Sequence, residues 1–282
     1  MVTLKNEKLI AEISELGAEL KSLKKDGSEY MWQGDPNVWS GTSPVLFPML
    51  CSLRDDKYIL NGREYKLEKH GFARHKTFLV ESATETSAVF LLKDDEDTLK
   101  SFPFKFEFRV VFTLNEDSLK VEYRVKNLSE DTMYFSVGAH EAYMTPEGIE
   151  DYDIIFPEKE IFDSVLLNGG LLQKNNMLIA KNTNILPLYD KYFVLDTLIF
   201  RNLKSKSCIL RNRKTERSVK IEFPDCDYLA IWHKMSAGYI CIEPWSGLPD
   251  REDSNYDITE KEGIITLSGK GEYTNSHTVT IL

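Results

Sequence analysis

The chain has 282 residues, of which 42% are hydrophobic and 28% charged, a composition typical of soluble globular proteins rather than disordered ones. Its 45 acidic and 35 basic residues give a formal charge of -10, which excludes an overall positive field that would attract nucleic acid or anionic membranes. The start lacks an apolar region of signal-peptide length, and charges recur too often for a membrane span. We therefore expect a cytoplasmic protein with neither nucleic-acid nor membrane partners.

The first clear structural signal is a hairpin centred on Asn61-Gly62, because a type I′ turn needs residues that tolerate positive φ. The turn joins apolar runs at residues 58–60 and 65–67. Runs at 78–82 and 88–92 predict two more strands. The best helical candidate is one short stretch at 94–101, where the acidic residues 94–97 indicate a solvated loop or a helix start.

The strongest alternation follows, with apolar residues at every second position from Phe104 to Leu114 and again from Leu119 to Val125. The polar residues 115–118 between them predict a turn, so these two runs should form an antiparallel pair.

Further short strands are predicted at 133–137, 207–210, 219–223, 239–242 and 264–267, and Asn168-Gly169-Gly170 is typical of a turn. No repeat, low-complexity tract or Gly/Ser linker marks a boundary. The pattern predicts one all-β domain over residues 1–282, built as a sandwich or a barrel.

The sequence lacks the motifs of several common catalytic and binding sites. There is no glycine-rich nucleotide or phosphate loop and no Gly-x-Ser-x-Gly nucleophile motif. The five histidines show no close ligand spacing, so we expect no metal and no cofactor. The four cysteines form no Cys-x-x-Cys pair and are interpreted as packing thiols.

Two segments place a titratable side chain where a strand could open into a cleft. His140 follows Gly138, and a glycine inside a strand often marks the close approach of a ligand or of backbone. Glu243 ends the apolar run 239–242, Pro244 is expected to stop the ladder there, and Trp245 offers an apolar face suited to a sugar. From the residues alone, the alternative interpretations are favoured: a satisfied core or surface histidine, a rim glutamate and a packing tryptophan.

A third cluster combines Arg54 with the basic segment 69–76, which contains His70 and Arg74. Arginine and histidine can bind sugar hydroxyls, a ring oxygen or a phosphate. The alternative is a pair of basic loops that flank the Asn61-Gly62 hairpin.

Taken together, these segments resemble the aldose 1-epimerase, or galactose mutarotase-like, superfamily, and within it the bacterial LacX-like branch. The resemblance extends over nearly the whole chain and rests on motifs in a fixed order: Gly17-Ala18-Glu19-Leu20, Met31-Trp32-Gln33-Gly34, Trp39, Pro44-Val45-Leu46-Phe47-Pro48, Arg54, His70-Gly71-Phe72-Ala73-Arg74, Gly138-Ala139-His140, Asp196 and Glu243-Pro244-Trp245-Ser246-Gly247. It implies a large antiparallel β-supersandwich that holds a sugar on an open, concave face.

Position by position, the resemblance implies His140 as the general acid and Glu243 as the general base of a ring-opening epimerisation at the anomeric carbon. Arg54 and His70 would bind the sugar and polarise its ring oxygen, while Asp196 would bind a hydroxyl, with nearby Asp190 as the alternative. Neither metal nor cofactor is required by such chemistry.

The resemblance does not determine which sugar is the substrate, because the segment around His70 is also similar to hexose-6-phosphate 1-epimerases. In that subgroup basic residues bind the phosphate, and Arg74 and Lys76 would do so here. The acidic surplus of the chain favours a free hexose such as galactose or glucose. A noncatalytic sugar-binding or regulatory protein on the same fold is the third reading, and the sequence gives no ground for choosing monomer over dimer.

Overall fold

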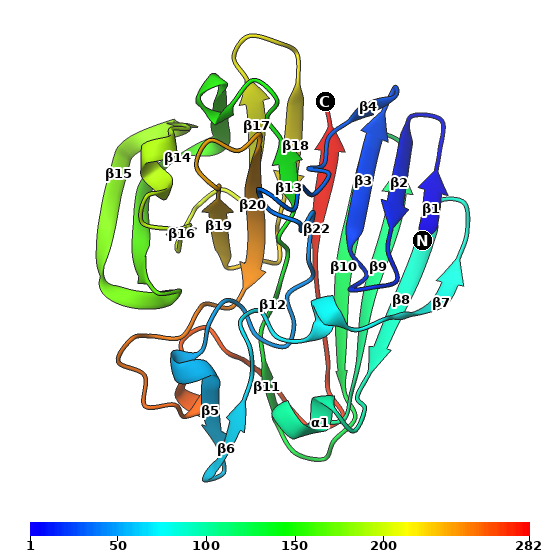
Figure 1. The fold of residues 1–282 in the computed structure, drawn as a ribbon, viewed down its shortest axis with the longest axis vertical. Coiled ribbons are helices and arrows are strands. Elements are labelled where there is room, and N and C mark those ends of the chain that lie inside the picture. Colours follow the sequence, from blue (N-terminus) through cyan, green and yellow to red (C-terminus); the bar gives the residue numbers. More distant parts are fainter.

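A computed structural model describes residues 1–282, and it contains almost only strands (Figure 1). The single α-helix, α1 (Thr98–Ser101), is one turn long, and no helix is long and apolar enough to cross a membrane. The strands of the first half of the chain are β1 (Val2–Lys5), β2 (Leu9–Ile13), β3 (Leu20–Lys25), β4 (Ser28–Glu29), β5 (Lys57–Leu60), β6 (Arg63–Lys66), β7 (Leu79–Ala83), β8 (Ser87–Lys93), β9 (Phe106–Asn115), β10 (Ser118–Asn127), β11 (Met133–Phe135), β12 (Val137–Gly138) and β13 (Ala142–Met144). Those of the second half are β14 (Tyr152–Asn168), β15 (Leu171–Pro187), β16 (Leu198–Phe200), β17 (Ser207–Asn212), β18 (Ser218–Glu222), β19 (Tyr228–Trp232), β20 (Tyr239–Ser246), β21 (Ile265–Leu267) and β22 (Glu272–Ile281).

One antiparallel sheet of 14 strands forms the body of the molecule, and 12 of them follow the order β12-β20-β19-β16-β14-β17-β18-β22-β10-β9-β8-β7. Two further strands join it at the side, β13 beside β20 and β15 beside β14. A separate sheet, β1 to β4, lies over β8, β9 and β10 in Figure 1. This is the all-β supersandwich that the family resemblance implies.

The core lies between these layers because the strands alternate as their sequences predict. The side chains from Phe104 to Leu114 and from Leu119 to Val125 that were expected to face inward are all buried. They belong to one apolar cluster of 61 residues, which runs from Leu4 to Ile281 and includes the inward side chains of β1, β2 and β3. Burial of this continuous apolar surface is what holds the two layers together.

The hairpins expected from turn residues are confirmed. Asn61 and Gly62 both adopt positive φ between β5 and β6, and β9 pairs with β10 in the antiparallel sense, as expected. Gly169 and Gly170 make the turn between β14 and β15. The predicted helical stretch at 94–101 shrinks to the single turn of α1.

One expectation about local structure is wrong: Pro244 does not end its strand, because β20 continues through it to Ser246. Its carbonyl accepts a hydrogen bond from the Ala139 N–H at 3.1 Å. In an antiparallel strand the N–H and C=O of one residue point to the same side, so the N–H that proline lacks would face that same neighbour. There the partner strand is interrupted between β12 and β13, and the proline is tolerated.

Candidate active site

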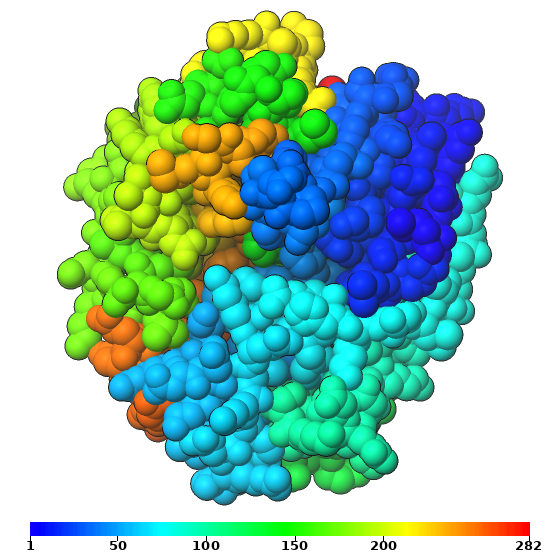
Figure 2. Space-filling view, in the orientation of Figure 1, coloured from blue at the N-terminus to red at the C-terminus, as the bar shows by residue number.

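A cavity of about 610 Å³ opens near the middle of the face shown in Figure 2. It lies where residues 39–51, residues 69–75 and the segment 230–245 meet. That volume lies within the range of small-molecule sites. Its walls come from the loop that holds Trp39, the loop that holds Lys69 to His75, the junction between β12 and β13, strands β19 and β20, and the turn before β16. Segments distant in sequence therefore meet at one hollow.

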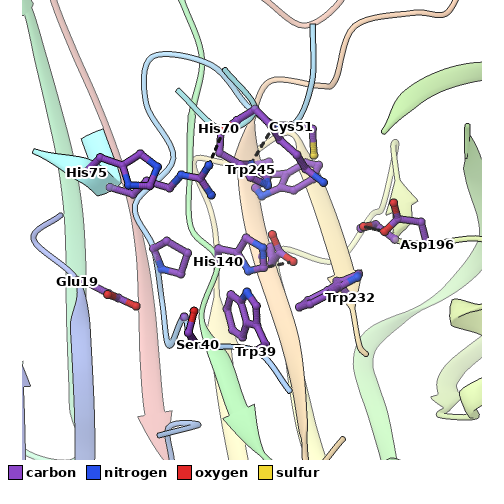
Figure 3. Close-up of a pocket in the computed structure, with 16 residues that line it drawn as sticks. Glu19, Trp39, Ser40, Cys51, His70, His75, His140, Asp196, Trp232 and Trp245 are labelled. Carbon is purple, nitrogen blue, oxygen red and sulfur yellow. Dashed lines mark hydrogen bonds and ion pairs between the residues drawn. The ribbon is translucent and has the colours of Figure 1, made fainter. Parts of the chain in front are cut away.

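His140 and Glu243 both line this cavity, and Figure 3 shows His140 between Trp39 and Trp245. His140 Nδ1 lies 3.5 Å from Glu243 Oε1, and the two residues are only 9% and 1% exposed. His140 Nδ1 and the second carboxylate oxygen, Glu243 Oε2, have no hydrogen-bond partner. Since buried polar groups are normally paired, these two atoms are poised to bind something that enters the cavity.

The backbone that carries His140 is the interruption between β12 and β13. Next to it, the Trp245 indole donates its Nε1–H to the Ala139 carbonyl at 3.0 Å. The indole also packs against Gly138, where an added Cβ would lie 2.6 Å from Trp245 Cδ1 and 3.0 Å from Leu50 Cδ2. The glycine thus permits a close approach, as expected, but by Trp245. This packing holds the backbone just before His140.

Burial favours the neutral form of both members of the pair. Removal from water lowers the pKa of His140 from 6.5 to about 3, and the cations of Lys69 and Arg74 act in the same direction. Removal from water also raises the pKa of Glu243 well above its usual 4.5, and the nearby Glu141 carboxylate adds to that rise. Strongly perturbed acid and base groups that share a cavity are characteristic of functional sites.

His70 lies beside the pair, with its ring 5.6 Å from that of His140. Burial holds its pKa well below 6.5, so the ring is neutral at physiological pH. Its Nδ1 accepts a hydrogen bond from the Cys51 N–H at 3.1 Å. The remaining proton is therefore on Nε2, which makes His70 a hydrogen-bond donor there.

Three non-glycine residues of the cavity wall have left-handed backbone conformations: Cys51 (φ 48), His70 (φ 67) and Asp196 (φ 81). Such conformations cost energy for residues with a side chain, and they concentrate at functional sites. They direct these side chains in ways that regular strands do not allow.

Two tryptophans that the sequence analysis assigned no role in binding form aromatic walls. The Trp39 ring stacks on the His140 ring at 5.1 Å and 25°, and Trp232 meets the same imidazole edge-on at 5.7 Å. Aromatic faces of this kind pack well against the C–H surface of a sugar. The tryptophan named from sequence, Trp245, also lines the cavity but is almost fully buried.

The rim of the cavity carries both signs of charge. Lys69 and Arg74 line it and form no ion pair, although Arg74 donates one hydrogen bond to the Lys69 carbonyl. Asp196 lies on one side of the cavity and Glu19 on the opposite side in Figure 3. The Glu19 carboxylate is already used by the backbone N–H groups of Thr42 and Ser43.

Arg54 does not line the cavity, although the resemblance implies a sugar contact for it. Its guanidinium donates to the Ser254 carbonyl at 2.7 Å and stacks over the Tyr256 ring at 4.9 Å. These interactions hold it away from His140. By contrast, Asp196 does line the cavity, whereas Asp190 is bound to buried His233 at 2.7 Å.

The cysteines are all free and buried, as expected, but Cys51 also lines the cavity. Burial raises the pKa of its thiol to about 12, so it remains protonated. Cys241 lies deeper, and its sulfur comes within 4.8 Å of donor atoms of His140 and Glu243. A metal bound there would occupy the same two groups that proton transfer requires.

Comparisons with known proteins show which family the chain belongs to. The family model for aldose 1-epimerase matches residues 1–256. Protein LacX, plasmid, of Lactococcus lactis subsp. lactis is 35% identical over 296 residues, which cover 100% of this chain and 99% of that protein. The solved structure of a galactose mutarotase related enzyme from Lactobacillus acidophilus is 35% identical, with a TM-score of 0.95 over 100% of this chain and 97% of that one. A galactose mutarotase-like protein from Lactobacillus casei ATCC 334 is 30% identical, with a TM-score of 0.94 and full coverage of both chains.

Proposed function

Because this chain belongs to the aldose 1-epimerase family, we propose that it is a mutarotase that interconverts the α and β anomers of a free hexose such as galactose or glucose. The observation that supports this proposal most directly is the pairing of His140 with Glu243 in one cavity, 3.5 Å apart. A binding protein would need polar groups there, but it would not need an acid and a base with strongly perturbed pKa values.

The reaction begins with one proton shared by the pair. Glu243 takes the proton of the anomeric hydroxyl while His140 gives one to the ring oxygen, and the pyranose opens to an aldehyde. Rotation about the C1–C2 bond presents the other face of the carbonyl. Reclosure with the transfers reversed gives the opposite anomer. Each well-placed proton transfer is worth about 10²–10⁴ in rate.

Proton accounting fits the electrostatics of the site. Before ring opening the proton is on His140, and after ring opening it is on Glu243, so the pair carries one proton in both states. Burial favours neutral His140 and protonated Glu243, which is the state that accompanies the open-chain aldehyde. The same burial disfavours the charged pair from which ring opening starts, so it favours the open-chain state relative to that starting form.

The other walls supply binding and orientation. The Nε2–H of His70 would donate to the ring oxygen or a hydroxyl, and Asp196 would accept from a hydroxyl. Trp39 and Trp232 would pack on the apolar face of the ring, with Trp245 beneath. No sugar contact is assigned to Arg54.

A hexose 6-phosphate is the second candidate substrate, favoured by one observation. Lys69 and Arg74 line the cavity without an acidic partner, and two such cations could take a phosphate. Asp196 and the net charge of -10 oppose it.

Polarimetry and NMR of freshly dissolved α-anomers test the proposal. Wild-type protein should accelerate equilibration of glucose or galactose with saturation kinetics, and it should act less well on the 6-phosphates. A preference for the phosphates that disappears in a Lys69→Ala/Arg74→Ala double variant would favour the second candidate. Saturable binding without acceleration for any sugar would favour the noncatalytic reading.

A further inference from the structure

A second buried pair of a histidine and a glutamate lies next to the catalytic pair. His277 Nε2 and Glu141 Oε1 are 2.8 Å apart, and the side chains are 1% and 4% exposed. Glu141 comes from the junction between β12 and β13, and His277 comes from β22. The roles described above use neither residue. Buried ionisable groups are costly to maintain, so this pair calls for a physical explanation.

The pair is built into the backbone that carries both catalytic residues. Glu141 directly follows His140, and successive side chains of an extended chain point to opposite faces. His140 therefore faces the cavity, while Glu141 enters the core and reaches His277. The Glu141 carbonyl also accepts a hydrogen bond from the N–H of Ile242, the residue before Glu243. The backbone of Glu141 is thus connected to both catalytic residues, His140 and Glu243.

On the basis of the proposed function, we propose that Glu141, which is hydrogen-bonded to His277, is a positioning residue for the epimerisation. Its anchored side chain fixes the junction that presents His140, and its carboxylate places a negative charge close to Glu243. The charge favours retention of the one proton that the catalytic pair passes between its members.

The Glu141 charge raises the pKa values of several buried neighbouring groups. The side chain lies among the buried hydroxyls of Tyr123 and Tyr143 and the thiol of Cys241, and its charge contributes to the raised pKa of each. Glu141 Oε2 has no hydrogen-bond partner. His277 is the one cation-forming side chain paired with it. In an apolar, water-poor environment a partly compensated carboxylate acts on its neighbours with little screening.

Glu243 is the neighbour through which this charge affects the reaction. After burial, repulsion by Glu141 is the largest cause of its raised pKa, and Asp196 adds to it. The ammonium of Lys69 opposes the rise, and His140 faces the carboxylate at 3.5 Å. Without the Glu141 charge, Glu243 would hold its proton less tightly, and the pair would lose its single proton at a lower pH.

The test compares the pH profile of kcat for wild type, Glu141→Gln and Glu141→Asp. The glutamine variant keeps the shape of the side chain and removes its charge. We expect the high-pH limb of its profile, where Glu243 loses its proton, to move to lower pH by about half a unit or more, with KM changed less than about twofold. The aspartate variant keeps the charge and should stay near the wild-type profile. Glu272→Gln, which changes an exposed carboxylate on the same strand as His277, is the matched control and should leave the profile unchanged.

A glutamine profile that superimposes on wild type, or an aspartate profile that shifts as far as glutamine, would overturn the proposal. A second readout separates this result from the fate of the proposed function. The ¹³C carboxyl resonance of Glu243, assigned by its loss in Glu243→Gln, reports the titration of that residue even if no sugar is turned over. Its midpoint should fall in Glu141→Gln, and an unchanged midpoint would contradict the role of Glu141 in either case.

If circular dichroism shows that Glu141→Gln does not fold, His277→Gln provides the test. Its amide can still donate a hydrogen bond to Glu141 but, unlike an imidazole, can never carry a positive charge beside that carboxylate. The Glu243 midpoint should then rise, and a fall would overturn the proposal.

Discussion

Replacement of Glu243 by glutamine is the sharpest test of the catalytic pair. Glutamine has nearly the same shape, so the cavity is preserved, but it cannot accept the anomeric proton. General-base catalysis is worth about 10²–10⁴ in rate, and each factor of ten equals about 1.4 kcal/mol, so the loss corresponds to about 3–5 kcal/mol of transition-state stabilisation. Polarimetry of α-galactose or α-glucose at saturating sugar would measure it as a fall in kcat.

The same substitution should not destabilise the fold. The Glu243 carboxyl is almost fully buried, and one of its oxygens is unpartnered. Its pKa is raised, so the stability linked to its protonation is complete below the unfolded-state pKa of about 4.5 and is lost as pH rises through the folded-state pKa. Glutamine does not titrate and escapes this loss. The variant should therefore become more stable relative to wild type as pH rises from 5 to 8, by about 1 kcal/mol or more.

Thermal unfolding at pH 5 and pH 8 measures this effect, with Glu222→Gln on strand β18 as the control because its carboxylate is partly exposed and paired with Lys220. A fall in kcat of less than about tenfold would remove the general-base role from Glu243. A variant that melts well below wild type at pH 8 would refute the electrostatic reasoning, whatever its activity.

Four further predictions follow from single side chains. His140→Gln should lower kcat by about 10²-fold or more. Because the pKa of His140 is about 3 in the folded wild type, the stability linked to this group is complete above pH 6.5 and is lost as pH falls towards 3. Urea unfolding should therefore show less acid destabilisation in the variant. Trp39→Ala should raise KM for the sugar by about tenfold through loss of the ring that stacks beside His140, measured from initial rates. Arg54→Ala should keep kcat/KM within about twofold of wild type, since its guanidinium is bound to Ser254 outside the cavity. Gly138→Ala should lower the free energy of unfolding by about 1–3 kcal/mol in urea titrations, because the new methyl group would clash with Trp245.

Much of the fold could be predicted because strong local signals coincide with real elements. The strict alternation around β9 and β10 and the turn residues of the β5–β6 hairpin gave correct strands and correct antiparallel pairs. The long strand β15 escaped detection because polar side chains interrupt its apolar ones and only Leu172 and Leu186 are buried, so no apolar period marks it. It is a strand because it pairs with β14, whose own alternation is broken by several bulges.

The candidate site was only partly accessible from sequence, for a related reason. His140 and Glu243 were identified by family resemblance, and the structure brings them together. Trp39 and Trp232 belong to different segments, and only tertiary packing makes them walls of one cavity. For Trp39 the available signal was its place in a polar loop, because so large an apolar side chain needs a surface to cover; Trp232 ends the apolar strand β19 and gives no such signal. Arg54 illustrates the opposite limit, since proximity to a basic loop in sequence does not determine where a flexible side chain finds its partners.

The interruption between β12 and β13 explains why the reactive groups gather where they do. A continuous strand there would pair its backbone fully with β20 and would require an N–H at position 244. Pro244 removes that donor, and the interrupted neighbour has no need of it; the freed Ala139 carbonyl is instead satisfied by Trp245. The same interruption turns His140 towards the cavity and Glu141 towards His277. A sequence that restored the regular ladder would improve the sheet locally, but it would separate the imidazole from the Glu243 carboxylate, so the irregularity and the proposed chemistry depend on the same few backbone atoms.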